Sequence, residues 1–81
     1  MKYSFQKLAN RIAAQFNWEA NGFKLNDFEV VFDDRICFVT GILDDGEAVL
    51  SDVVESMENE GTSEFTDEEL RKLETLINNQ L

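Results

Sequence analysis

Residues 28–43 read FEVVFDDRICFVTGIL, two apolar runs separated by the polar pair Asp33-Asp34. Apolar residues recur at every second position in both runs, which is the period of a half-buried strand, and β-branched and aromatic residues favour that conformation. A short polar pair between two such runs is typical of a tight connection. The stretch therefore predicts an antiparallel hairpin of residues 28–32 and 35–43.

Both faces of this predicted hairpin carry apolar side chains. One face would present Phe28, Val30, Phe32, Ile36, Phe38, Thr40 and Ile42. The other would present Val31, Cys37, Val39 and Leu43. One layer of helices cannot cover both faces, so we expect a bent sheet or a second copy of the chain to cover the second one.

The segment after the hairpin is compatible with two structures. Asp44-Asp45-Gly46 is a turn signal, and the apolar residues that follow it are β-branched but also fit a helical stripe: Val49, Leu50, Val53, Val54 and Met57. We expect a third strand, because the short connection extends the hairpin to a meander, and a helix over 48–57 is the alternative. Residues 58–64 are expected to form an acidic loop.

Two helices are predicted to flank the strands. The first covers residues 4–17, with Ser4 as N-cap, and Asn21-Gly22 closes the region that follows it. The second begins after Thr66, whose side chain forms a capping box with Glu69. Their apolar stripes are Phe5, Leu8, Ala9, Ile12 and Phe16 in the first, and Leu70, Leu73, Leu76, Ile77 and Leu81 in the second.

The predicted architecture is a single α+β domain over residues 1–81. Its order is α-β-β-β-α, a three-stranded antiparallel meander with both helices on one face. Eighty-one residues are enough for one hydrophobic core.

Composition argues against several kinds of function. The chain has no histidine and no motif for a metal, a phosphate or another cofactor, so an enzyme is not expected. Cys37 is the one cysteine, which allows no internal disulfide and suggests a reducing cytoplasm. The sequence lacks an apolar run long enough for a membrane span and a secretory signal at its N-terminus.

Net charge is the strongest functional signal in the sequence. The first 43 residues balance five acids with five bases, so the formal net charge of −10 belongs to residues 44–81. Such an asymmetry repels nucleic acid and attracts basic proteins. A solvated face that keeps the protein soluble is the plainer explanation. The candidate partner-binding residues are Asp44, Asp45, Glu47, Asp52, Glu55, Glu58, Glu60 and Glu64.

The chain is short and has no histidine, and its acidic half, Asp44–Leu81, includes the helix start Glu64-Phe-Thr-Asp-Glu-Glu-Leu70. In these features the sequence resembles small accessory proteins of bacteriophages and mobile elements. That class includes anti-CRISPR and anti-restriction inhibitors, some of which mimic DNA. The resemblance implies an inhibitor that occupies the basic nucleic-acid-binding surface of a target protein. A homodimeric structural or assembly subunit is the alternative.

Overall fold

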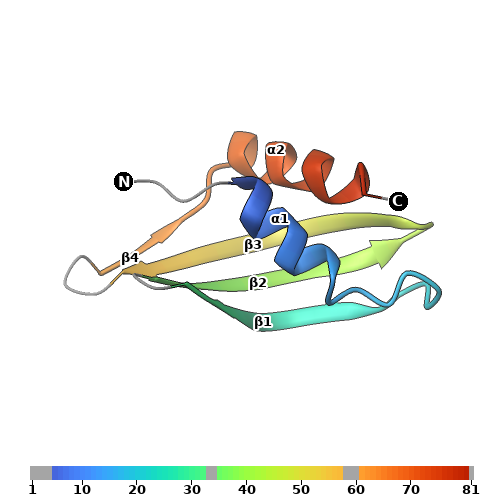
Figure 1. Ribbon diagram of the computed structural model, residues 1–81, viewed down its shortest axis with the longest axis horizontal. Helices are drawn as coiled ribbons and strands as arrows, with labels where there is room; N and C mark the ends of the chain where they lie inside the picture. The colour runs from blue at the N-terminus through green and yellow to red at the C-terminus, as the bar shows by residue number, and fades with distance from the viewer. Residues whose placement is uncertain (1–4, 33–34, 58–60, 81) are drawn as a thin grey trace.

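The computed structural model describes residues 5–32, 35–57 and 61–80 (Figure 1). Its four strands form one antiparallel sheet in the order β1-β2-β3-β4, and both helices lie on the same face of that sheet. The elements are α1 (Phe5–Ala13), β1 (Lys24–Val31), β2 (Arg35–Asp44), β3 (Glu47–Met57), β4 (Gly61–Glu64) and α2 (Asp67–Asn78). The α+β class is confirmed, but the meander has four strands instead of three.

The hairpin of β2 and β3 is the longest pairing in the sheet, running from Arg35 opposite Met57 to Asp44 opposite Glu47. Its two-residue turn has φ of 51° at Asp45 and 82° at Gly46. Positive φ at both positions is the requirement of a type I′ turn, which Asp-Gly meets readily. The prediction of a third strand is confirmed, and the alternative helix over 48–57 is wrong.

The helices cover the opposite face of β2 from the one that the sequence led us to expect. Cys37, Val39 and Leu43 are buried beneath the helices, whereas Ile36, Phe38, Thr40 and Ile42 are half-buried on the face that points away from the helices. Because both sets are apolar, alternation shows which residues share a face but not which face is covered.

Val31 was grouped with Cys37 in the prediction, and this grouping is wrong. Val31 pairs with Ile36, so it lies on the face that points away from the helices, and 54% of its surface is exposed. Val30 pairs with Cys37 and is buried. The predicted turn residues Asp33 and Asp34 lie outside the described residues.

Strand β1 begins four residues earlier than the predicted strand, at Lys24. The register shifts between Leu25 and Phe28, and Asp27 has a φ of 47°. A β-bulge of this kind places two consecutive polar residues inside a strand and breaks the alternation of apolar residues. The sequence pattern therefore reveals only the part of β1 beyond the bulge.

Strand β4 occupies part of the segment that was expected to be a loop. Gly61–Glu64 pairs with Val54–Met57, and all four residues of β4 are exposed. Their backbone groups, not apolar side chains, hold them to the sheet, so the sequence has no hydrophobic pattern there. Residues 58–60 of the predicted loop lie outside the described residues.

Helix α1 ends at Ala13 instead of at residue 17. The indole Nε1 of Trp18 donates to the carbonyl of Ala13 at 3.1 Å, which satisfies a backbone group at the end of the helix. Phe16 stays buried beyond the helix end, with its ring centroid 5.3 Å from that of Trp18 and 6.1 Å from that of Phe23. The predicted N-cap Ser4 lies outside the described residues.

The predicted capping box at the start of α2 is confirmed. Thr66 Oγ1 accepts from the Glu69 amide at 3.2 Å, and the Thr66 amide donates to Glu69 Oε1 at 2.9 Å. The apolar side of α2 then buries Leu70, Leu73 and Ile77. Just beyond the end of α2, Gln80 Nε2 donates to Asn10 Oδ1 of α1 at 2.8 Å.

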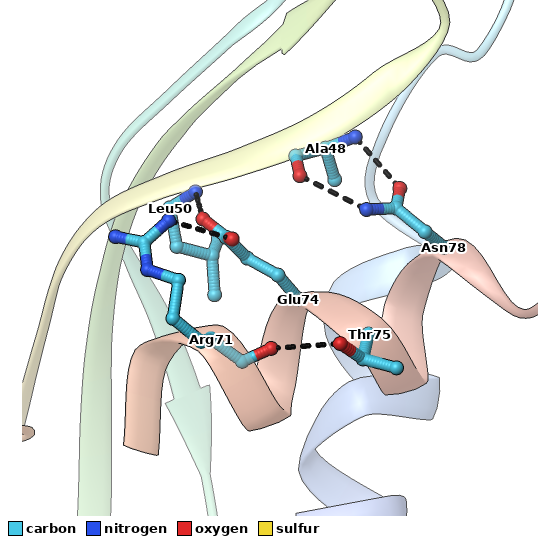
Figure 2. A network of polar contacts seen from close by, with 6 residues as sticks. All are labelled: Ala48, Leu50, Arg71, Glu74, Thr75 and Asn78. Carbon is cyan, nitrogen blue, oxygen red and sulfur yellow. Dashed lines mark hydrogen bonds and ion pairs between the residues drawn. The ribbon is translucent and has the colours of Figure 1, made fainter. Parts of the chain in front are cut away.

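Side chains of α2 take the place of a neighbouring strand along the first half of β3 (Figure 2). β4 pairs only with Val54–Met57, so the earlier part of β3 has no described strand on that side. There, Asn78 accepts from the Ala48 amide at 2.8 Å and donates to the Ala48 carbonyl at 3.2 Å. Glu74 Oε2 accepts from the Leu50 amide at 2.6 Å. These bonds protect a sheet edge that would otherwise be open to other strands.

We expect Leu73→Ala to lower the free energy of unfolding by about 2–5 kcal/mol, because Leu73 has no exposed surface and its removal leaves a cavity. Chemical denaturation monitored by circular dichroism measures the loss. Val31→Ala, at an exposed position, is the control and should change stability by less than about 0.5 kcal/mol. Equal stability of the two variants would contradict the assignment of the covered face.

Glu74→Ala should lower the free energy of unfolding by about 1–3 kcal/mol, because it leaves the backbone amide of Leu50 without its acceptor. Glu74→Gln keeps an acceptor oxygen and should lose less. Arg71→Ala removes the 2.8 Å ion pair with Glu74 but keeps the backbone bond, so it should cost less than about 1 kcal/mol. A loss as large for Arg71→Ala as for Glu74→Ala would assign the effect to the ion pair.

Candidate partner-binding interface

The face of the sheet that points away from the helices is apolar at its centre. Cross-strand pairing places Phe38 beside Val54, and Ile42 beside Val49. Phe38, Ile42 and Val54 are half-buried, and Val49 is 37% exposed. Neither α1 nor α2 lies on this face (Figure 1). Large side chains that are only partly covered by their own sheet form a surface on which a partner can gain apolar contact.

Acidic side chains border this apolar centre. Glu29 pairs with Phe38 from β1, and Glu64 pairs with Val54 from β4, so the two glutamates lie at opposite ends of one cross-strand row. Asp52 pairs with Thr40 in the next row, and Asp44 pairs with Glu47 beside the turn. Among the described strand residues that point to this face, Lys24 carries the positive charge. We refer to the apolar centre and its acidic border as the open face.

The structure brings four of the eight predicted partner-binding residues to the open face: Asp44, Glu47, Asp52 and Glu64. Asp45 lies in the turn next to them, where its amide donates to Asn21 Oδ1 at 2.9 Å. Glu58 and Glu60 lie outside the described residues. From Glu47 to Val54, the neighbour of Glu64, the strand rises about 23 Å, so the acids are spread along the sheet and do not form a tight cluster.

Glu55 points to the helix-covered face, not to the open face. Its Oε1 lies 2.7 Å from Nη1 of Arg35, and the side chains are 14% and 6% exposed, respectively. Glu55 pairs with Cys37 in the register, which places it on the covered side. Glu55 therefore does not join the other predicted partner-binding residues on the open face: it neutralises a buried arginine of the same sheet.

Sequence reasoning missed Glu29 and the apolar part of the surface. Glu29 belongs to the half of the chain whose charges balance, so a count by halves does not single it out. Its place in the strand pattern, between Phe28 and Val30, was the signal that it points away from the buried side. The apolar residues were identified as a face, but that face was expected to be covered.

Within residues 5–32, 35–57 and 61–80, no group of three His, Cys, Asp or Glu side chains is arranged to hold a metal ion. Neither described helix has the length and apolarity needed to cross a membrane. Cys37 is buried in the core, with no exposed surface.

Comparison of the chain with protein-family models, with curated proteins and with solved structures finds no match. The open face is therefore the feature from which a function can be inferred.

We expect Glu55→Gln to lower the free energy of unfolding by more than about 1.5 kcal/mol, because it removes the charged partner of Arg35 within the fold. Urea denaturation provides the measurement. Glu64→Gln changes the same functional group at an exposed position and should alter stability by no more than about 0.5 kcal/mol. A neutral Glu55→Gln would show that this carboxylate is available for another role.

Proposed function

We propose that this chain is a non-catalytic binding protein whose open face engages the basic surface of a nucleic-acid-binding protein. The observation that supports the proposal is the combination on one uncovered sheet face of an apolar centre, around Phe38 and Val54, with a border of carboxylates from all four strands. In the reducing cytoplasm of a bacterial host, such a protein would act as an inhibitor of the anti-CRISPR or anti-restriction type, a partial mimic of DNA.

The two parts of the open face have different roles in this proposal. Apolar and aromatic residues at the centre of an interface supply most of the binding energy once water is excluded. Charges at the border contribute to recognition and to the rate of association, and they disfavour partners of the same sign. Spaced carboxylates attract the lysine and arginine side chains that otherwise contact phosphates.

A homodimer through the open face is the less favoured alternative. Two copies would bring Glu29, Asp52 and Glu64 of one chain against acids of the other, and each chain has a formal net charge of −10. Like charges across an interface oppose association. In addition, Cys37, Val39 and Leu43, which suggested a second copy, are buried under the helices.

Affinity capture with matched baits tests the proposal. The parent chain, Asp52→Asn/Glu64→Gln and Asp67→Asn/Glu68→Gln are immobilised and exposed to a bacterial lysate, and the retained proteins are identified. Both double variants lose two negative charges through the same substitutions, but Asp67 and Glu68 lie in the first turn of α2 instead of on the open face. We expect the parent and the α2 variant to retain a nucleic-acid-binding protein that the open-face variant retains poorly.

Two further measurements complete the experiment. A duplex oligonucleotide should displace the captured protein from the parent chain, and binding should weaken steeply between about 50 and 500 mM salt as the charges are screened. Equal retention by both double variants, or a captured protein without a basic surface, would contradict the proposal. A parent chain that is dimeric by light scattering, with the dimer lost on Phe38→Ser, would favour the homodimer.

A further inference from the structure

A second surface lies at the other edge of the sheet, between α1 and β1. Two adjoining hollows of about 350 and 400 Å³ share Arg11 and Val31. The first is lined by Arg11, Ala14, Gln15, Phe28, Glu29, Val30 and Val31. The second is lined by Lys7, Asn10, Arg11, Val31 and Phe32. Together they form a groove, which we call the α1–β1 groove.

Among the residues that the structure describes, no strand pairs with the backbone along this groove. β1 is the first strand of the sheet and pairs with β2 on one side. The Phe32 amide donates to the Arg35 carbonyl at 2.8 Å, so the alternation of an antiparallel ladder turns the N–H and C=O groups of Val31 and Glu29 away from β2. Arg11 Nη1 donates to the Val31 carbonyl from the groove side, which agrees with this direction.

The edge of β1 and the edge along the first half of β3 differ in their protection. Glu74 and Asn78 occupy the edge of β3 with three hydrogen bonds to its backbone. Among the described residues, the edge of β1 between Glu29 and Val31 receives only the single bond from Arg11. A strand edge with free N–H and C=O groups is the template on which proteins add an extended peptide.

The positive charge beside the α1–β1 groove determines which kind of peptide segment the groove can bind. Lys7 and Arg11 are four residues apart on α1 and therefore lie on one side of the helix, next to Phe32. Within the described residues, neither forms an ion pair with a carboxylate. An added strand that places a carboxylate opposite Phe32 would receive charge-assisted hydrogen bonds from these two side chains.

We propose that the α1–β1 groove binds an extended peptide that carries a carboxylate, adding it antiparallel to β1 as a fifth strand. The residue opposite Phe32 is acidic and meets Lys7 and Arg11. The residue opposite Val30 is a small apolar one and enters the first hollow beside Ala14. The Glu29 side chain points to the open face, and the side chain of the peptide residue opposite it lies beside it on that face. This peptide residue is basic, so that it pairs with the Glu29 carboxylate.

A second copy of this chain fits the groove less well. If two β1 strands paired around a two-fold axis near Val30, Lys7 and Arg11 of both copies would converge at the axis. Four cationic groups in one place repel each other, whereas a peptide carboxylate neutralises them. In addition, Phe28 and Val30 of the second copy would remain packed under their own helices and could not fill the hollows.

A synthetic peptide with blocked ends, Thr-Glu-Thr-Val-Lys-Val-Thr, is the probe for this site. Its Glu lies opposite Phe32 and its central Val opposite Val30. The Thr before that Val pairs with Val31, and the Lys after it pairs with Glu29. We expect titration of the ¹⁵N-labelled chain to shift the amide resonances of Glu29 and Val31 and to slow their hydrogen exchange.

Two control peptides separate strand addition from charge attraction. N-methylation of the Thr that pairs with Val31 and of the Lys that pairs with Glu29 removes the donors that face β1 and should abolish binding. Replacement of the peptide Glu by Lys should weaken binding by more than about tenfold, because it removes the charge-assisted hydrogen bonds from both Lys7 and Arg11 and places a like charge beside them. Equal binding of either control peptide would overturn the proposal.

Variants of the chain supply the matching test. Arg11→Gln should weaken binding of the Glu peptide about tenfold, whereas Lys24→Gln, the same loss of charge at the start of β1 and outside both hollows, should leave it unchanged. Absence of shifts at Glu29 and Val31 at millimolar peptide would overturn the proposal. The proposal would also be overturned if the chain were dimeric and these two amides exchanged their hydrogens slowly without peptide, since the edge of β1 would then hold a second copy. The residues varied for the open face, Asp52 and Glu64, play no part here, so each proposal can fail without the other.

Discussion

The backbone edge of β3 is the constraint on which the arrangement of the molecule depends. Between Glu47 and Val53 this strand has a neighbouring strand on one side only, and Glu74 and Asn78 supply the missing hydrogen-bond partners from α2. Side chains four residues apart on a helix lie about one turn apart, close to the spacing of alternate residues in a strand, so the match fixes α2 along the sheet. With α2 held there, Leu73 and Ile77 are buried over the sheet.

The position of α2 determines which face stays uncovered. α1 packs beside α2 on the same side, where Phe5 stacks on Phe65 with ring centroids 5.5 Å apart. Two short helices cover one face of a four-stranded sheet, and the chain has no further described element for the other. The apolar residues around Phe38 therefore remain available to another molecule, and the acids beside them determine the charge that such a molecule should have.

Features that depend on a few neighbouring residues could be predicted from the sequence, and features that depend on tertiary pairing could not. The capping box of Thr66 and Glu69 and the turn at Asp45-Gly46 have local causes, and both were identified. Strand β4 and the bulge at Asp27 depend on backbone pairing with distant residues. The same division applies to the candidate interface. The distribution of charge along the sequence identified Asp52 and Glu64. The position of Glu55 beside Arg35 on the covered face, and that of Glu29 on the open face, depend on how the strands pair.

The contact between the two helices also has a consequence for synthesis on the ribosome. Asn10 and Gln80, which are hydrogen-bonded, are 70 residues apart in the chain. α1 therefore emerges early but cannot complete its packing until α2 has left the exit tunnel, whereas the hairpins between them need only near neighbours. During that interval the nascent meander exposes Val39, Leu43 and Leu50, apolar side chains that are buried in the folded chain. Co-translational folding of this chain should thus end in one late step, in which the last helix closes over the sheet and the first.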